Sequence, residues 1–498
     1  MSINSRMVLY RGCLKSCNYS CSYCPFSKHQ TSERELRKDK EQWSLFCQSL
    51  LERKEILNIH ALMVVPYGEA LIHSWYWEGF GNLTGTEFIE AVGAQTNLSF
   101  SIETSLRIYR EAGGQTDKLR LWATFHPEMI SVEEFIEKCC HIKEAGIPLS
   151  VGAVGNPENL TIIRKLRDRL PEEIYLWLNK MEGLRRFYTE KEKEEFQAID
   201  PFFFRELVPV PGNTNQCKER LFIEGDGKLR GCNISPLLKQ DWYKNWETVF
   251  DTPPECRRKI CSCYLAYAGR QDVINKVLFG KYPLFRISIK PKAAFLDIDG
   301  TLIPKGELEI PEYTLVGLKA LAELGKTLLF FATSLPIKEA YRRCQKAWSL
   351  FQGGVFAGGA HVVVKSSQSK REAFSYLNRT CLSVVKQYQK SLHYRILIYG
   401  TKENIYKITL VRPRSLPWKE DQVQMLIEEC RKQRIGKPLV HSFVEGHCLE
   451  LIADGIDKAG GVKKICHWLG ISPAEVVAVG DSKEDERMIA ICGMGYHC

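Results

Sequence analysis

One stretch of the chain, KAAFLDIDGTLI at residues 292–303, constrains the fold more than any other. Its short, continuous apolar run is typical of a strand that is buried in a parallel sheet. The run ends in Asp297 and Asp299, whose side chains point the same way because they stand two residues apart. Gly300 and Thr301 then bend the chain away. The stretch therefore predicts an α/β region in which two carboxylates act together at the end of a strand.

Three further motifs follow this stretch in order. The apolar run TLLFFATS contains Thr333 near its end, and Lys458 opens a predicted helix in DKAGGVKKI. A third apolar run, in AEVVAVGDSKEDERMI, is followed by Asp481 and Asp485. The four motifs resemble those of the haloacid dehalogenase (HAD) superfamily, in its sugar-phosphatase-like branch, although Ser334 stands where glycine is more usual. The alternative is a doubly wound domain whose strand ends are capped and carry no chemistry.

This resemblance implies a phosphatase with a Rossmann-like fold. Asp297 would be the nucleophile that forms an aspartyl-phosphate. Asp299 would protonate the leaving alcohol and then activate water, while Thr333 and Lys458 would bind the phosphoryl oxygens. The resemblance also implies Mg²⁺, a hard ion that takes oxygen ligands. Its ligands would be Asp297, the Asp299 carbonyl, Asp481 and Asp485.

Residues 368–443 interrupt the HAD-like pattern and contain strand-like and helix-like runs of their own. An inserted α/β module at this place matches the cap of sugar-phosphatase-like HAD proteins. Such caps supply substrate specificity and exclude water. Three basic residues of this module, Arg412, Arg414 and Lys419, face either an anionic substrate or solvent.

The N-terminal part, residues 1–205, alternates strand-like and helix-like stretches, which predicts a parallel sheet, closed or open. After the first strand-like run, CNYSCSYC places Cys17, Cys21 and Cys24 within eight residues. Three thiolates can hold one iron–sulfur cluster and leave an iron free to bind a cofactor. A closed zinc site would need a fourth ligand, for which Cys13 is the candidate. Buried, inert thiols are the other alternative.

With Tyr23 directly before the last cysteine, the triplet resembles the signature of the radical S-adenosylmethionine (SAM) superfamily. The resemblance implies a partial (β/α)6 barrel and a [4Fe–4S] cluster that binds SAM and cleaves it to a 5′-deoxyadenosyl radical. Further motifs of that superfamily follow at predicted strand ends, where α/β barrels place their sites. One of them is partial, because Tyr67 replaces its first glycine. The residues that the resemblance assigns to SAM are Gly68, Glu69, Gln95, Asn97, His126 and Ser150.

The middle of the chain, residues 206–290, is dense in cysteine. The Asp-Gly pair at 226–227 predicts a hairpin with a cysteine on each side. The pattern resembles SPASM and twitch domains, which hold auxiliary [4Fe–4S] clusters on cysteines, and it favours the smaller twitch type with one cluster. Its preferred ligands are Cys217, Cys232, Cys261 and Cys263, with Cys256 as a substitute. A four-thiolate zinc site is the alternative. Over residues 1–290 the chain resembles a small radical SAM family of undefined role.

Composition bounds the class of protein. A chain of 498 residues, 44% hydrophobic and 26% charged, is typical of several globular domains. Its 69 Lys and Arg against 59 Asp and Glu give a charge of +10, which favours an anionic ligand, and no run of like charges indicates a nucleic-acid arm. No apolar run is long enough to cross a bilayer or resembles a secretory signal, so we expect a cytoplasmic protein without a membrane partner.

Together the resemblances imply a bifunctional enzyme: a radical SAM barrel at 1–205, an auxiliary iron–sulfur domain at 206–290 and a HAD phosphatase at 291–498. The expected reaction is radical oxidation or rearrangement of a phosphorylated small molecule, a sugar or nucleotide, followed by removal of its phosphate. A flavodoxin or ferredoxin would supply the electron. One alternative is a radical enzyme that modifies a ribosomal peptide and carries an attached phosphatase. The other is a non-catalytic chain with structural zinc.

Overall fold

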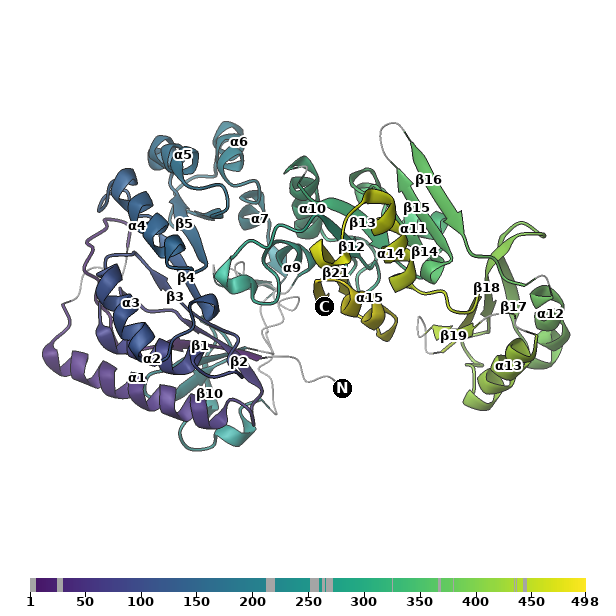
Figure 1. Cartoon of the computed structure of the whole chain (residues 1–498), viewed down its shortest axis with the longest axis horizontal. Coiled ribbons are helices and arrows are strands. Elements are labelled where there is room, and N and C mark those ends of the chain that lie inside the picture. The colour runs from purple at the N-terminus through teal and green to yellow at the C-terminus, as the bar shows by residue number, and fades with distance from the viewer. Residues whose placement is uncertain are drawn as a thin grey trace. The chain divides into compact units, whose positions relative to one another are not determined.

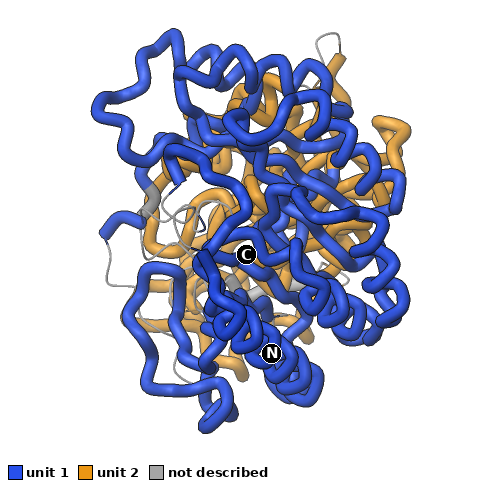
Figure 2. The backbone as a smooth tube through the Cα atoms, turned by 90° about the vertical axis from the view of Figure 1, so that its left-hand side faces the viewer, with its two compact units in different colours: residues 1–271, 278–289 blue, residues 272–277, 290–498 orange. Residues whose placement is uncertain are grey.

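The computed structural model of the chain describes residues 6–24, 30–211, 220–250, 259–261, 265, 272–324, 326–365, 369–378, 380–433, 435, 437–441 and 446–498. The chain divides into two compact units (Figure 2). The first unit comprises residues 1–271 and 278–289, and the second comprises 272–277 and 290–498. The division falls next to the buried strand at which the HAD-like pattern of the sequence begins.

Nine strands of the first unit form one sheet, in the order β10-β9-β8-β1-β2-β3-β4-β5-β6 (Figure 1). From β1 to β6 the neighbours are parallel and follow the order of the sequence, because a helix after each strand returns the chain. The strands are β1 (Arg6–Arg11), β2 (Ile59–Val64), β3 (Ala91–Thr96), β4 (Leu119–Thr124), β5 (Leu149–Gly155) and β6 (Leu176–Lys180). The helices are α1 (Glu33–Arg53), α2 (Ser74–Thr84), α3 (Ile102–Glu111), α4 (Val132–Glu144), α5 (Leu160–Arg169), α6 (Glu190–Ile199) and α7 (Phe204–Leu207).

The expected hairpin is present in this sheet. Strands β8 (Arg220–Glu224) and β9 (Lys228–Arg230) pair antiparallel, and Gly227 between them has φ of +88°, which glycine adopts without steric cost. Strand β8 also pairs in parallel with β1, and β10 (Leu237–Asp241) pairs with β9. The sheet is therefore mixed and open, so the barrel predicted from the resemblance is not confirmed.

Both faces of the parallel strands are buried, which explains their continuous apolar runs. In β1, Val8 and Tyr10 pack with the helices in the larger core, whereas Met7 and Leu9 face the smaller core on the other side. The smaller core includes Phe285 from the short segment after helix α9 (Val273–Phe279). A separate two-stranded sheet joins β7 (Val210–Pro211) to β11 (Ile260–Cys261).

The second unit is built on a seven-stranded sheet, in the order β16-β15-β14-β13-β12-β21-β22. Five of these strands are parallel, and β15 and β16 are antiparallel at one edge. The strands are β12 (Ala293–Leu296), β13 (Leu328–Ala332), β14 (Gly353–Phe356), β15 (His361–Lys365), β16 (Lys370–Phe374), β21 (Val476–Gly480) and β22 (Met494–His497). The helices are α10 (Glu312–Leu324), α11 (Ile337–Arg343), α14 (Lys458–Leu469) and α15 (Glu486–Ile491). The α/β, Rossmann-like fold expected for this part of the chain is confirmed.

A smaller α/β module is inserted between β16 and α14 (Figure 1). Its antiparallel sheet has the order β17-β18-β20-β19, and its own apolar core includes Ile408, Leu426 and Leu449. The elements are α12 (Cys381–Leu392), β17 (Arg395–Gly400), β18 (Ile405–Val411), α13 (Glu420–Lys432), β19 (Lys437–His441) and β20 (Cys448–Ile452). The last strand of this sheet lies beyond residue 443, where the sequence placed the end of the module.

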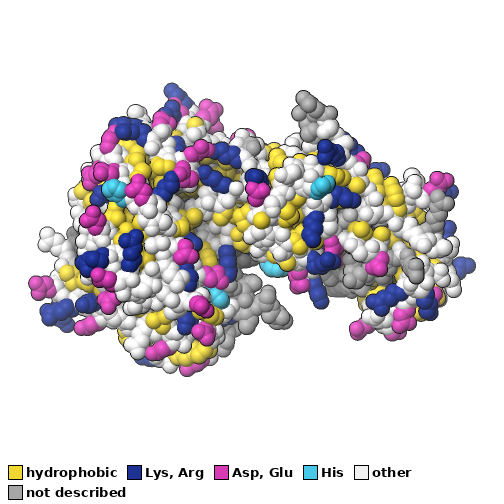
Figure 3. All heavy atoms as spheres, in the orientation of Figure 1, with side chains coloured by type: hydrophobic (Ala, Val, Ile, Leu, Met, Phe, Trp, Pro, Cys, Tyr) yellow, Lys and Arg dark blue, Asp and Glu magenta, His cyan; other side chains and the backbone are white. Residues whose placement is uncertain are grey.

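Within the described part of the chain, no helix has both the length and the apolar character that crossing a membrane requires. On the face drawn in Figure 3, basic and acidic side chains are interspersed over both units.

Candidate functional site

Three carboxylates of the second unit meet at the carboxyl ends of two adjacent parallel strands. Asp297 follows β12 and Asp481 follows β21, and these strands pair in register at Leu296 and Val479. One ligand oxygen from each of Asp297, Asp481 and Asp485 lies within 4.8 Å of the others. Oxygens at this separation suit a hard divalent cation such as Mg²⁺. The chemistry of this acidic site therefore fits the metal that the sequence predicted.

Glycine at position 300 lets this site close. Gly300 has φ of +80°, and a Cβ there would lie 2.1 Å from Oδ2 of Asp481. A side chain would therefore both strain the turn and displace a carboxylate of the site. The sequence indicated the turn, and the contact with Asp481 adds the reason for glycine.

Lys458 lies in the centre of the acidic site. It is the first residue of α14, whose N-cap Asp457 accepts a hydrogen bond from the Gly460 N–H at 2.7 Å. The Lys458 ammonium donates to Oδ1 of Asp297 at 2.9 Å and to Oδ1 of Asp485 at 2.7 Å. Burial would lower the pKa of Lys458, but the two carboxylates raise it well above its ordinary value. The lysine is therefore charged, as a group that binds phosphoryl oxygens must be.

Asp297 is buried, and this burial raises its pKa, while the Lys458 charge opposes the rise. Thr333 directly follows β13, is also buried, and accepts a hydrogen bond at its hydroxyl from the Leu335 N–H at 3.1 Å. Its own N–H donates to the Val355 carbonyl at 2.8 Å. Thus Asp297 and Thr333 stand at the carboxyl ends of neighbouring parallel strands, as their motifs predict.

Two cations contact this site that the sequence did not single out. The Arg343 guanidinium lies 2.8 Å from Oδ1 of Asp299, and the Lys305 ammonium lies 2.9 Å from Oδ2 of Asp481. Neither residue belongs to a motif, and only the fold brings them to these carboxylates. Asp299 itself pairs through its side chain with Arg343, while the carboxylate cluster is formed by the other three aspartates.

The inserted module touches the loop that follows β13. The ammonium of Lys407, on β18, is fully buried, donates to the Ser334 carbonyl at 2.6 Å and forms an ion pair with Glu450. Arg412 is buried and donates to the side-chain oxygen of Gln422 at 2.5 Å. Arg412 therefore stabilises the module from inside. The sequence had offered it contact with an anionic substrate or with solvent, and the structure shows neither. Arg414 and Lys419 are exposed.

A comparison with protein families finds a match to part of the second unit. The family described as haloacid dehalogenase-like hydrolase matches residues 401–497, a span that includes Lys458, Asp481 and Asp485. The C-terminal region is a HAD-superfamily hydrolase. Asp297 and Thr333 precede the matched span. Asp297 contacts Lys458, which lies inside that span, and Thr333 follows the strand beside that of Asp297.

Two curated proteins are similar over short segments. Phosphoglycolate phosphatase from Natronomonas pharaonis is 31% identical over 51 residues, which are 10% of this chain and 23% of that protein. A chloroplastic endoribonuclease, YBEY, from Arabidopsis thaliana is 38% identical over 47 residues, which are 9% of this chain and 8% of that protein. The chain thus spans less than a quarter of the length of either relative.

Two solved structures are each similar to about two fifths of the chain. A haloacid dehalogenase-like hydrolase from Bacteroides thetaiotaomicron has a TM-score of 0.36 and 21% identity, over 42% of this chain and 88% of that one. A HAD subclass IIB sugar phosphatase has a TM-score of 0.34 and 16% identity, over 41% of this chain and 86% of that one.

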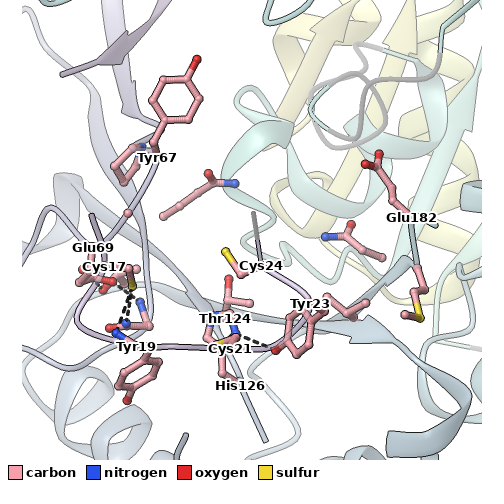
Figure 4. Close-up of a pocket in the computed structure, with 18 of the residues that line it drawn as sticks. Cys17, Tyr19, Cys21, Tyr23, Cys24, Tyr67, Glu69, Thr124, His126 and Glu182 are labelled. Atoms are coloured by element: carbon pink, nitrogen blue, oxygen red, sulfur yellow. Dashed lines mark hydrogen bonds between the residues drawn. The ribbon is translucent and has the colours of Figure 1, made fainter. Parts of the chain in front are cut away.

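The first unit carries a pocket of its own, lined by the cysteine triplet (Figure 4). Each parallel strand from β1 to β6 contributes at its carboxyl end or in the loop that follows. We call this cavity the cysteine pocket. Its lining is Cys17, Tyr19, Cys21, Tyr23, Cys24, Pro66, Tyr67, Gly68, Glu69, Gln95, Thr96, Asn97, Thr124, His126, Val154, Asn179, Lys180, Met181, Glu182 and Glu206.

The Gly68-Glu69 pair closes one side of the cysteine pocket. A Cβ on Gly68 would lie 1.6 Å from the Ser16 carbonyl oxygen, so only glycine lets the cysteine loop approach this closely. The Glu69 carboxylate is buried and accepts hydrogen bonds from the Thr96 hydroxyl at 2.8 Å and the Asn97 N–H at 2.5 Å. Burial raises the pKa of Glu69 to about 7, against the effect of these donors. The pair thus links the loop after β2 to the end of β3.

His126 fixes the other side of the cysteine loop. Its Nδ1 lies 2.8 Å from the Tyr23 hydroxyl and 3.4 Å from the Cys21 sulfur (Figure 4). Burial lowers the pKa of His126 to about 4, so the ring is neutral at physiological pH. The nearby Glu128 carboxylate accepts hydrogen bonds from the N–H and the hydroxyl of Ser22, both at 2.7 Å. The loop is therefore tied to the segment after β4.

The sulfur atoms of the three thiols do not converge as the ligands of a single zinc ion would. Zinc–sulfur bonds of about 2.3 Å in a tetrahedron would bring thiolates to about 3.8 Å from one another. Among the described residues, the three aspartates above are the group that converges within 4.8 Å, and the triplet is not. Cys13, the fourth ligand of the zinc alternative, is outside the lining of the pocket, and its N–H donates to Asp39 at 3.2 Å.

The sequence assigned Ser150 to this cofactor site, and the structure does not place it there. Its buried hydroxyl donates to the Phe285 carbonyl at 2.8 Å, a partner supplied by a segment far along the chain. Gly68, Glu69, Gln95, Asn97 and His126 do line the cysteine pocket.

The structure describes two of the five cysteines that were predicted as ligands of the auxiliary cluster. Cys232 follows β9, and its N–H donates to the Ser235 hydroxyl at 3.1 Å. Cys261 lies in β11 and packs in the smaller core of the first unit. The other predicted ligands, Cys217, Cys256 and Cys263, lie outside the described residues.

Proposed function

We propose that the second unit is a Mg²⁺-dependent phosphomonoester hydrolase. The observation that carries this proposal is the contact of Lys458 with both Asp297 and Asp485, beyond the carboxyl ends of two paired parallel strands. A buried nucleophile beside a fixed positive charge is what transfer of a phosphoryl group requires. The family described as hydrolase and the relative described as phosphoglycolate phosphatase both fit this chemistry.

The residues of the acidic site would act in two steps. Asp297 attacks the phosphorus atom and forms an aspartyl-phosphate, while Asp299 gives its proton to the leaving oxygen and releases the alcohol. Asp299 then takes a proton from water, which attacks the same phosphorus and frees inorganic phosphate and Asp297. Lys458 and Thr333 bind the phosphoryl oxygens throughout. Held by Asp297, Asp481 and Asp485, Mg²⁺ would offset the negative charge of the transferred group.

Hydrolysis of an aryl phosphate, p-nitrophenyl phosphate, by the full chain tests this proposal. Wild type should turn it over with Mg²⁺ and stop when the metal is chelated. Asp297→Asn keeps the shape of the nucleophile and should lower kcat by several orders of magnitude. The matched control is Asp454→Asn, an exposed aspartate of the same unit, which should keep wild-type turnover. Equal rates in the two variants would refute the proposal.

For the first unit we propose a radical SAM activity. The observation that favours it is the cysteine pocket, in which the triplet, Glu69, Asn97 and His126 come from the ends of successive parallel strands. A [4Fe–4S] cluster held by Cys17, Cys21 and Cys24, with SAM bound beside Glu69, would supply radical chemistry to a substrate. Asn97 would orient the loop, since its side-chain nitrogen lies 3.6 Å from the Cys17 sulfur. At the far end of the pocket, Asn179, Lys180 and Glu182 would contact the substrate.

This second proposal is tested by formation of 5′-deoxyadenosine from SAM under anaerobic reduction. Wild type should form it, and a variant with Cys17, Cys21 and Cys24 changed to Ala should not. The variant should also lose the iron of this site. Cys140→Ala, on α4 and outside the pocket, is the control and should retain both. Equal cleavage by the triple variant would remove the assignment.

The two activities would then act on one small molecule. In this extension of the proposal, the first unit oxidises or rearranges a phosphorylated sugar or nucleotide, and the second unit removes its phosphate. A flavodoxin or ferredoxin would supply the electron. An auxiliary [4Fe–4S] cluster on the central cysteines would accept an electron or anchor the substrate. The alternative to a phosphorylated small molecule is a ribosomal peptide as the substrate of the first unit. Accumulation of a modified, still phosphorylated product by Asp297→Asn would favour the small molecule.

A further inference from the structure

We propose that Arg343 selects phosphomonoesters whose leaving group carries a second anionic group, a carboxylate or a phosphate. This inference rests on the proposed phosphatase activity and adds a substrate class to it. Arg343 is the last residue of α11, and its Nη2 lies 2.8 Å from Oδ1 of Asp299. The Arg343 side chain is 33% exposed and that of Asp299 is 21% exposed, so both are partly accessible to solvent.

The partner of Arg343 places it on the leaving-group side of the site. Asp299 is the acid that protonates the departing oxygen, so a cation in contact with Asp299 lies beside the alcohol product. Lys458 instead contacts Asp297, the proposed nucleophile, and Asp485. The phosphoryl group and the leaving group would therefore meet different cations.

The guanidinium of Arg343 has donors to spare for a ligand. Arginine carries five N–H donors in a planar fork, which binds carboxylate or phosphate in pairs of parallel hydrogen bonds. Among the residues that the structure describes, Asp299 is the acidic partner of Arg343, and the distance of 2.8 Å joins Nη2 of Arg343 to Oδ1 of Asp299. A substrate anion can thus engage the rest of the fork without a competing carboxylate of the protein.

The other cations near the acidic site are placed differently. Lys407 is fully buried, and its charge is matched by Glu450 and by the Ser334 carbonyl. Lys305 pairs with Asp481, one of the three aspartates that would hold Mg²⁺, and its side chain is 82% exposed. Arg343 is the cation that touches the acid of the reaction and belongs to a helix of the core.

A purely positioning role for Arg343 makes a different prediction. If the guanidinium only oriented Asp299, its loss would slow every phosphomonoester to the same extent. If it binds the leaving group, its loss slows the substrates that carry the second anion more than the others. The ratio of kcat/KM between paired substrates separates these two roles.

The experiment compares two pairs of substrates on the full chain with Mg²⁺. The first pair is 3-phosphoglycerate and glycerol 3-phosphate, which differ in a carboxylate, and the second is glucose 1,6-bisphosphate and glucose 6-phosphate, which differ in a phosphate. Wild type should prefer the member with the second anionic group in at least one pair. The preferred pair shows whether that group is a carboxylate or a phosphate. Arg343→Met should lower kcat/KM for that member about 10- to 100-fold, the loss expected for a charged hydrogen-bonding partner. The loss for the member without the second anion, and for p-nitrophenyl phosphate, should be smaller, so the ratio of kcat/KM between the two members should fall.

Two further variants sharpen the test. Arg342→Met removes an exposed charge one residue earlier in α11 and should keep the wild-type preference. Arg343→Lys keeps the charge without the planar fork and should restore only part of the preference. The inference is overturned if wild type hydrolyses p-nitrophenyl phosphate yet favours neither anionic member, or if Arg343→Met slows all substrates equally. Absence of any phosphatase activity in wild type would instead refute the proposed function.

Discussion

At the scale of single residues, buried charges in both units are held by specific partners. Lys458 is almost wholly buried between two carboxylates, and Glu69 is buried among hydrogen-bond donors. Removing water from such groups is costly unless their charge is satisfied. The pKa values of these residues therefore differ from their ordinary values, and the free energy of unfolding should depend on pH where such a group titrates.

Glu69 gives a prediction for the first unit. Its pKa in the folded state, about 7, is above the usual value of 4.5 because of burial. The unfolded state therefore loses this proton at lower pH, and the free energy of unfolding should fall as pH rises from about 4.5 to 7. Glu69→Gln cannot titrate, so its stability relative to wild type should rise over this window by up to about 3 kcal/mol.

Urea denaturation at pH 5 and pH 7.5, followed by tryptophan fluorescence, measures this difference. Glu78→Gln, an exposed glutamate on α2, serves as the control and should follow wild type at both values. An unchanged difference between wild type and Glu69→Gln across the window would show that Glu69 is ionised in the folded protein throughout.

At the scale of elements, the turn after β12 joins the nucleophile to the metal-binding carboxylates. Gly300→Ala would place a methyl group against Asp481 in a left-handed turn. We expect Mg²⁺-dependent phosphatase activity to fall by about 100-fold, because small displacements of reacting groups are costly. Gly306→Ala is matched to it, since Gly306 also has positive φ, at +92°, but has no atom within 4 Å of an added Cβ.

This second variant should show the strain of the turn without the loss of activity. Comparable activity in Gly300→Ala and Gly306→Ala would mean that the approach to Asp481 is unimportant for catalysis. Thermal unfolding of both variants compares their stability. Gly306→Ala should lose about 1–2 kcal/mol through its left-handed backbone, and Gly300→Ala should lose at least as much.

The elements also show what a sequence can predict of a site. Asp297, Thr333 and Asp481 were predictable because each directly follows a buried strand, and parallel strands end at the same edge of a sheet. Lys458 was predictable because it opens a helix in a motif that resembles one of the HAD superfamily. In each case a local pattern fixes the position of the side chain.

Other parts of the sites depend on contacts that no local pattern contains. Arg343 and Lys305 reach the acidic site only through the packing of α11 and the loop after β12. Ser150 was assigned to the cofactor site from the resemblance alone, whereas in the structure its hydroxyl bonds to Phe285, 135 residues further along the chain. Long-range hydrogen bonds of this kind are set by the tertiary fold.

At the scale of the whole molecule, the second unit begins before the HAD-like sequence pattern does. Residues 272–277 belong to it, and the Lys276 ammonium donates to the His497 carbonyl near the C-terminus. A fragment of residues 272–498 should therefore fold and hydrolyse p-nitrophenyl phosphate with a kcat close to that of the full chain. A fragment of residues 291–498 lacks this contact and should unfold at a lower temperature.

Thermal unfolding and turnover of the two fragments test this boundary. Lys276→Met in the longer fragment is the matched variant and should lower its unfolding temperature toward that of the shorter one. Equal stability of all three proteins would place the boundary at residue 291, where the sequence put it.

The central claim is that Asp297 becomes phosphorylated during turnover, and rapid acid quenching with a substrate labelled in its phosphate measures this directly. We predict label on the peptide KAAFLDIDGTLI, removal of that label by hydroxylamine, which cleaves acyl phosphates, and no label in Asp297→Asn. Unlabelled protein in the presence of steady phosphate release, or label that persists in Asp297→Asn, would contradict the account.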